Sequence, residues 1–203
     1  MLMKIRTAAL TDIPYVYDIC HRTAYNGQDA SSMVTDPFIF GHYYSAPYLV
    51  HDPKWCWIAE DDRGIVGYLV TAPDTRRYVR WMNREWLPPI RKLYARCSPD
   101  PKWTGFEKWI RGYIHEDASF PDFVDDYPAH LHICFLPRGQ GQGLGSKALK
   151  LFETRLRAEG IPGYYLGMAE KNHRAKEFYL KRGLHLIRHD PGVIYFGKKL
   201  GKA

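Results

Sequence analysis

The sequence predicts an α/β protein in which helices cover one central β-sheet. Segments with the alternating spacing of strands and segments with the spacing of helices follow each other along the chain, without internal repeats. The composition favours a packed core, because 45% of the 203 residues are hydrophobic and 25% are charged. These values exclude a disordered tail, a collagen-like repeat and a coiled coil. We expect a single domain over residues 1–203.

The chain opens with a predicted strand and two predicted helical stretches. Residues 4–8 alternate like a short strand, and Asp12 offers an N-cap for a helix whose apolar positions recur to about Tyr25. Residues 36–49 are rich in aromatic side chains at helical spacing, and we expect this stretch to break near Pro47.

A hairpin and a tryptophan-rich insertion follow. Residues 55–60 and 65–70 have strand composition and flank a short Asp-Arg-Gly turn, which predicts the hairpin. The segment from about 73 to 128 then contains amphipathic stretches near residues 76–97 and 104–116. Four of the six tryptophans lie in this segment: Trp81, Trp86, Trp103 and Trp109. Because no change in composition marks a linker, we expect an insertion packed on the main domain.

The last third of the chain has the clearest pattern. Strands and helices alternate there, with glycines at the predicted ends of the helices. In order, we expect a strand at 130–136, a helix at 143–159, a strand at 164–169, a helix capped by Asn172 and ended by Gly183, and strands at 184–188 and 193–198.

The charge and the cysteines narrow the class of protein. The net charge of +7 favours an anionic partner, but the positive residues are dispersed and form no RNA-binding signature, so we expect no nucleic-acid partner. The chain shows no signal peptide and no apolar run long enough to span a membrane. The four cysteines form no CxxC pair, which predicts reduced thiols in a cytoplasmic protein and no zinc site.

A glycine-rich segment at residues 137–147, between a predicted strand and a predicted helix, suggests an anion site. A dinucleotide fingerprint fails because Leu144 or Ser146 stands at the third glycine, and a Walker A loop fails because Lys147 follows the serine. Residues 140–145 match the acyl-CoA loop Q/R-x-x-G-x-G/A at every fixed position. The alternative is a glycine-rich turn that binds nothing.

A second motif, Asn-His-Arg-Ala-Lys-Glu-Phe-Tyr at residues 172–179, follows the loop at a spacing of about thirty residues. With the loop, the opening residues 5–14 and the hairpin, it resembles the Gcn5-related N-acetyltransferase (GNAT) family over most of the chain. This resemblance implies a GNAT fold: a twisted mixed sheet of about six to seven strands flanked by helices, here with the tryptophan-rich helical insertion.

A closer resemblance involves Asp36-Pro37, the hairpin, and the insertion as far as residues 120–122. These segments are similar to the acetyltransferase-like domain attached to eukaryotic O-GlcNAc hydrolases and to its free-standing bacterial homologues. Members of that subfamily are suspected of being inactive where the glycine loop is missing. The loop is intact here, although Gly139 replaces a common aromatic residue, so we expect cofactor binding by a somewhat looser loop.

The resemblance implies that acetyl-CoA is the cofactor and assigns residues to it. The pantetheine arm is expected to lie along the strand before the loop, and the pyrophosphate is expected at the loop. The implied cofactor-binding residues are Cys134, Phe135, Leu136, Gln140, Gly141, Gln142, Gly143, Leu144, Gly145, Ser146, Asn172 and Phe178. Cys134 lies in an apolar strand that would keep its thiol protonated, so we expect no acyl-cysteine intermediate.

The resemblance also implies a general acid, Tyr179, which would protonate the departing thiolate. The alternative is that Tyr179 only packs beside Phe178. For the general base, His132 and His130 alternate on one predicted strand, and Glu170 is a second candidate; ordinary core or edge histidines remain the alternative. We expect no metal site, because the two histidines have no third ligand.

These observations predict an acetyl-CoA-dependent N-acetyltransferase, monomeric or homodimeric, that acts on a primary amine by direct attack. The acidic, aromatic stretch at residues 115–126 would suit a cationic amine acceptor, and the alternative is a solvated loop. The competing function is a catalytically weak or inactive acetyl-CoA-binding or interaction module.

Overall fold

The computed structural model describes residues 3–94 and 100–201, and it is built on a seven-stranded sheet in the order β1-β2-β3-β4-β5-β7-β6. All neighbouring strands are antiparallel except β4 and β5, so the predicted mixed sheet is confirmed. The strands are β1 (Lys4–Thr7), β2 (Trp57–Asp61), β3 (Gly64–Ala72), β4 (Ala129–Phe135), β5 (Gly163–Ala169), β6 (His185–Asp190) and β7 (Val193–Lys199).

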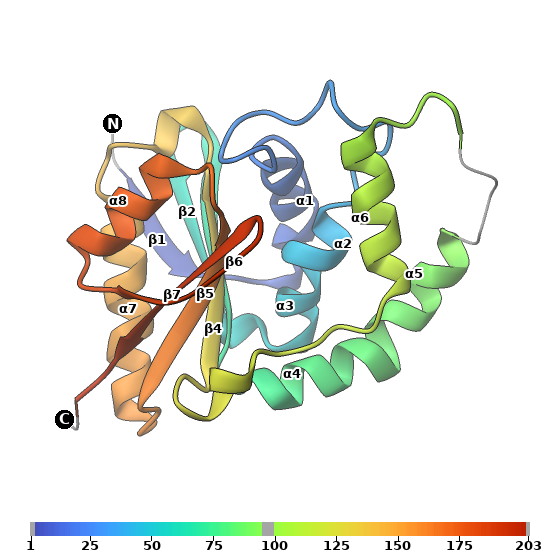
Figure 1. Ribbon diagram of the computed structural model, residues 1–203. Coiled ribbons are helices and arrows are strands. Elements are labelled where there is room, and N and C mark those ends of the chain that lie inside the picture. Colours follow the sequence, from blue (N-terminus) through green and yellow to red (C-terminus); the bar gives the residue numbers. More distant parts are fainter. Residues whose placement is uncertain (1–2, 95–99, 202–203) are drawn as a thin grey trace.

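Helices cover both faces of this sheet (Figure 1). One face packs against α1 (Ile13–His21), α2 (Gly41–Tyr44), α3 (Ala46–His51), α4 (Thr75–Trp81), α5 (Leu87–Leu93) and α6 (Gly105–His115). The other face packs against α7 (Leu144–Ala158) and α8 (His173–Lys181). Each face has its own hydrophobic core, because side chains alternate between the two sides of every strand.

The sheet splits between β4 and β5. These parallel strands pair only at Ala129 with Tyr164 and at His130 with Tyr165. Beyond these pairs β4 remains hydrogen-bonded to β3 as far as Phe135, whereas β5 continues with β7. The backbone of β4 after His130 therefore has an edge that faces no strand, and the glycine loop begins where this edge ends.

The tryptophan-rich insertion packs on the face that carries α1 to α3. The helix α4 continues through a π-helical turn, Met82–Trp86, into α5, and α6 returns along the same face. Glu107 of α6 is fully buried and accepts hydrogen bonds from the backbone and hydroxyl of Thr35 and from Arg111. Residues 95–97 of the predicted stretch, including Cys97, lie outside the described residues.

One predicted helix boundary was wrong in the first half of the chain. The first helix ends at His21 rather than near Tyr25, and the chain then turns, with Asn26 and Gly27 at positive φ values of 53° and 81°. Asp12 occupies the N-cap position of α1, as predicted, but its carboxylate forms no hydrogen bond to that helix. The carboxylate accepts the N–H of Ala9 and pairs with Arg6.

The aromatic-rich stretch breaks near Pro47, as predicted. It forms two short helices, α2 and α3, which are separated at Ser45. Pro47 lies in the first turn of α3, where a residue without an N–H is tolerated. The other predicted elements agree with the structure within a few residues, except that Trp55 lies in a 3-10 turn before β2.

Candidate functional site

The glycine loop connects the end of β4 to the start of α7. Gly141 and Gly143 have φ values of 73° and 74°, a left-handed conformation that costs a glycine little. Gly143 is the N-cap residue of α7, and no side chain caps this end of the helix. The backbone N–H groups of residues 141–146 donate to no acceptor among the described residues. Such N–H groups at the positive end of a helix dipole can hold an anion.

In three of the predicted cofactor-binding residues, the side chain contacts the protein itself. The N–H of Gln140 donates to Pro137, and its side-chain amide donates to the carbonyl of Phe135 over 2.7 Å and accepts from Arg174. Leu136 and Leu144 have buried side chains. The row of N–H groups without an acceptor among the described residues therefore begins at Gly141, and Gln140 braces the loop.

Two aromatic rings lie against the first turn of α7. A β-carbon on Gly145 would stand 3.0 Å from Cζ of Phe178 and 3.6 Å from Cε2 of Phe135. The glycine therefore lets both rings approach the helix, beside the half-buried Ser146. This position brings Phe178 next to the loop, although thirty-odd residues separate the two in the chain.

The expectation of a looser loop at Gly139 was wrong. Gly139 is buried, its N–H donates to the carbonyl of Leu136, and a β-carbon there would stand 3.0 Å from Cγ2 of Val66. A larger residue would meet β3, so the glycine allows the loop to pack closely against the sheet.

Cys134 and Asn172 lie at the two sides of the split. Burial raises the pKa of the Cys134 thiol, which keeps it protonated. The side-chain oxygen of Asn172 accepts the N–H of Ala175 over 3.1 Å, which confirms the predicted N-cap of α8. The Nδ2 atom of Asn172 faces the turn at Gly27, where a β-carbon would be 3.6 Å away.

Tyr179 lies on α8, in the core on the same side of the sheet as α7. It is 6% exposed and packs against Phe178 and Phe196. Its hydroxyl has no hydrogen-bond partner among the described residues. Burial raises its pKa, so the phenol is protonated at neutral pH and is able to donate a proton.

The two histidines of β4 point to the other side, toward α1 to α6, but they differ in their partners. His130 is bonded at both ring nitrogens, Nδ1 to Thr75 over 2.8 Å and Nε2 to Tyr48 over 2.9 Å. His132 is bonded only at Nδ1, to the hydroxyl of Tyr68 over 3.2 Å, among the described residues. Burial lowers the pKa of His130 to about 3 and that of His132 to about 4, so both rings are neutral at pH 7. His132 thus has a ring nitrogen available for a substrate.

Tyr68 and Tyr44 are the neighbours of His132 that sequence analysis missed. Tyr68 is fully buried on β3, and the ring of Tyr44 stacks on His132 at 5.5 Å between centroids. The third base candidate, Glu170, pairs with His189 over 2.9 Å, and both side chains are half exposed. The carboxylate of Glu170 is therefore already paired, and it lies at the sheet edge that β6 forms.

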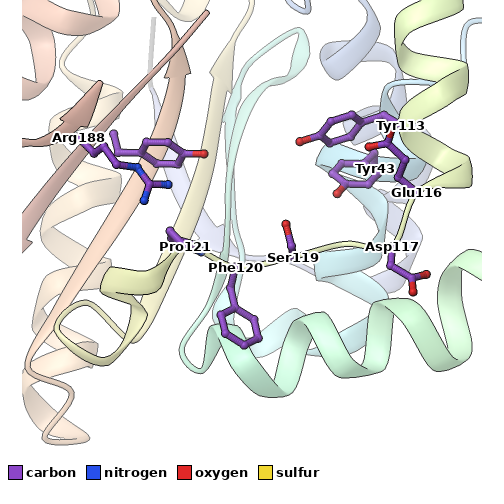
Figure 2. Close-up of a pocket in the computed structure, with 9 residues that line it drawn as sticks. Tyr43, Tyr113, Glu116, Asp117, Ser119, Phe120, Pro121 and Arg188 are labelled. Carbon is purple, nitrogen blue, oxygen red and sulfur yellow. The ribbon is translucent and has the colours of Figure 1, made fainter. Parts of the chain in front are cut away.

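The acidic stretch at residues 115–126 contributes to a pocket of about 190 Å³. Most of its carboxylates are paired, such as Asp122 with Arg188 and Asp125 with Arg76. Figure 2 shows Arg188 across the pocket from Tyr43, Tyr113 and Glu116. The residues that line it include Tyr43, Tyr113, Glu116, Ser119, Arg188 and Tyr195.

Within residues 3–94 and 100–201, no three His, Cys, Asp or Glu side chains are grouped so that they could hold a metal ion. In the same part of the chain, no helix has the length and apolar character needed to cross a membrane.

Comparison with known proteins supports the resemblance. Protein O-GlcNAcase from Rattus norvegicus and from Mus musculus is 22% identical over 190 residues, which is 91% of this chain and 21% of the relative. The chain thus spans about a fifth of the length of these curated relatives. Among solved structures, SsHAT is 31% identical with a TM-score of 0.90, and the match covers 100% of both chains.

More distant structures share the fold. The PaiA N-acetyltransferase from Thermoplasma acidophilum, solved in complex with coenzyme A, is 13% identical over 98% of this chain and 99% of its own, with a TM-score of 0.60. The ribosomal-protein-S18-alanine N-acetyltransferase from Escherichia coli is 15% identical over 100% of this chain and 96% of its own, with a TM-score of 0.54. The model of the acetyltransferase (GNAT) family matches residues 17–184, and the chain therefore belongs to the GNAT family of acetyltransferases.

Proposed function

We propose that the protein binds acetyl-CoA at the glycine loop and transfers the acetyl group to a primary amine by direct attack. The observation that carries this proposal is the row of free N–H groups over residues 141–146, at the point where β4 and β5 separate. Such a row, at the positive end of a helix dipole, fits the pyrophosphate of coenzyme A. When bound, acetyl-CoA supplies a thioester from which the acetyl carbon is transferred.

The unpaired edge of β4 suits the pantetheine arm, whose amides need hydrogen-bond partners. Phe135 lies on β4 beyond its last pair with β5, and its N–H faces this open edge, whereas its carbonyl accepts from Gln140. The backbone of Cys134 pairs with Tyr68 of β3. An extended chain that adds to a free strand edge gains hydrogen bonds without any rearrangement of the sheet. Phe178 would form one wall of this channel, and the free Nδ2 of Asn172 would be a donor at its other side.

Tyr179 and His132 lie on opposite sides of the sheet, on either side of the split. We assign Tyr179 as the general acid, because its raised pKa keeps the hydroxyl protonated and no described residue competes for its proton. The proton would pass to the sulfur that leaves on the α8 side. The amine would then approach from the side of α1 to α6, which His132 faces.

We assign His132 as the base that accepts the proton of the amine, directly or through water. Only the tautomer with Nδ1–H donating to the oxygen of Tyr68 leaves Nε2 free to accept a proton. Tyr68 would therefore be a positioning residue. The low pKa of His132 makes it a weak base that is unprotonated throughout the physiological range.

Calorimetric titration with acetyl-CoA tests the binding site. Gly143→Glu places a carboxylate among the N–H groups and should abolish binding. The matched control is Gly160→Glu at the other end of α7, where φ is +68° against +74° at Gly143 and a β-carbon meets nothing within 4 Å at either position. Equal loss of binding in both variants would mean that backbone strain, rather than the loop charge, causes the effect.

The weak basicity of His132 favours one competing function, an acetyl-CoA-binding module without catalysis. This alternative predicts acetyl-CoA binding without release of free coenzyme A in the presence of any amine. A thiol-reactive dye that follows coenzyme A release distinguishes the two functions.

A further inference from the structure

The pocket of about 190 Å³ has two walls whose residues contact the neighbours of the split in the sheet. On one wall, Tyr43 contacts Tyr44 at 5.1 Å between ring centroids, and Tyr44 stacks on His132. On the other wall, Tyr195 pairs with Gly167 of β5, and a β-carbon on Gly167 would stand 3.3 Å from its ring. Because Gly167 has no side chain, the ring of Tyr195 lies directly against the strand that leaves β4.

The pocket contains one carboxylate without a partner. Glu116 is the C-cap residue of α6, and its side chain forms no hydrogen bond or ion pair with any described residue. At this end of α6 the guanidinium of Arg91 donates to the carbonyls of Ile114 and Glu116 and pairs with Asp117 at 2.9 Å, so the carboxylate of Glu116 keeps its own charge uncompensated. Across the pocket, the charge of Arg188 is already compensated by Asp122 at 2.7 Å and Asp190 at 2.9 Å. The pocket is therefore negative in a protein whose net charge is +7.

The aromatic walls suit a cation as well. The rings of Tyr43 and Tyr113 line the pocket together with Glu116, and such rings attract an ammonium group, whereas the ring of Tyr195 on the other wall already has the guanidinium of Arg188 over it at 5.1 Å. The hydroxyls of Tyr43 and Tyr113 have no partner among the described residues and can accept its hydrogen bonds. The volume corresponds to about six water molecules, which is room for an ammonium group on a short alkyl chain.

The cation held by Glu116 cannot be the nitrogen that is acetylated. An attacking amine must be neutral, whereas a neighbouring carboxylate stabilises the protonated form. We propose that the acceptor is a short aliphatic diamine: one ammonium group binds Glu116 between the tyrosines, and the second amine reaches His132 at the split. This inference rests on the proposed function for the second step only.

Calorimetry with 1,4-diaminobutane, with and without coenzyme A, tests the pocket directly. Butylamine is the matched probe, since it has the same chain without the second ammonium group. We expect the diamine to bind about tenfold more tightly than butylamine, and Glu116→Gln to weaken diamine binding about tenfold, as for a lost charge-assisted hydrogen bond. Glu159→Gln, an exposed carboxylate at the far end of α7, should leave diamine binding unchanged.

Three results would overturn the inference: equal affinity for the two probes, unchanged diamine affinity in Glu116→Gln, or tighter binding of a lysine-containing peptide than of the diamine. A failure of the proposed function would give a different result. If acetyl-CoA does not bind, acetyl transfer is excluded, but the diamine titration on the protein alone still tests the pocket, because every residue that lines it belongs to this chain.

Discussion

The hydroxyl of Tyr68 on β3 lies 3.2 Å from Nδ1 of His132 on β4. The two residues are 64 positions apart, and the antiparallel pairing of β3 with β4 brings them to one face of the sheet. This contact leaves Nε2 of His132 as the ring nitrogen that can meet a substrate.

Removal of the Tyr68 hydroxyl tests this arrangement. Tyr68→Phe should lower turnover about tenfold, the value of one hydrogen bond, and shift the pH–rate profile while leaving the Kd for acetyl-CoA unchanged. The control is Tyr48→Phe, which removes the corresponding partner of His130. If both variants lower turnover equally, Tyr68 acts only through stability.

Tyr179→Phe separates catalysis from packing. The hydroxyl of Tyr179 bonds to no other described residue, so its loss should leave the thermal midpoint nearly unchanged. Turnover should fall by about 10²–10⁴, the usual contribution of a general acid. As a control, Tyr164→Phe removes a 2.7 Å bond to Glu153 and should cost about 2 kcal/mol of unfolding free energy. Unchanged turnover in Tyr179→Phe would remove it from the mechanism.

Gly145→Ala tests the contact between the loop and Phe178. Alanine normally stabilises a helix by about 1 kcal/mol relative to glycine, and Gly112→Ala on α6, where a β-carbon meets nothing, should show this gain. At Gly145 the methyl group would stand 3.0 Å from the Phe178 ring, so we expect no gain in thermal midpoint and weaker acetyl-CoA binding by calorimetry. A gain as large as that of Gly112→Ala would show that the ring moves freely.

The buried histidines predict acid sensitivity. Burial lowers the pKa of His130 from 6.5 to about 3 and that of His132 from 6.5 to about 4. At pH values between these lowered pKa values and 6.5, the unfolded chain therefore binds more protons than the folded chain. Stability should be complete above pH 6.5 and should decline below it, by about 1 kcal/mol for each histidine at pH 5.5. Urea unfolding midpoints measure this decline, and His130→Gln should reduce it. Equal midpoints at pH 7.5 and pH 5.5 would contradict the prediction.

The sequence predicts best where structure is local. The turn of residues 139–145 and the N-cap at Asn172 depend on glycine conformation and on hydrogen bonds between near neighbours, and both have the predicted form. The helix predicted to extend to Tyr25 ends at His21, and the chain then turns at Asn26 and Gly27. Pro47 lies in the first turn of α3, where a proline is tolerated.

The residues of the candidate site that depend on packing could not be predicted in this way. The sequence contains His130, His132 and Glu170 as equivalent base candidates, but only the partners that distant segments supply distinguish them. The carboxylates at residues 115–126 also look alike in the sequence, and only Glu116 is both unpaired and inside a pocket.

By itself, the sequence determined the fold class, the glycine loop and the helix that carries Tyr179, because periodicity and turn chemistry act over a few residues. The tertiary structure alone decided the split between β4 and β5, the contact of Tyr68 with His132 and the pocket beside Glu116. These features join segments 35 or more residues apart, and they depend on which strands pair and on which helices pack on each face of the sheet.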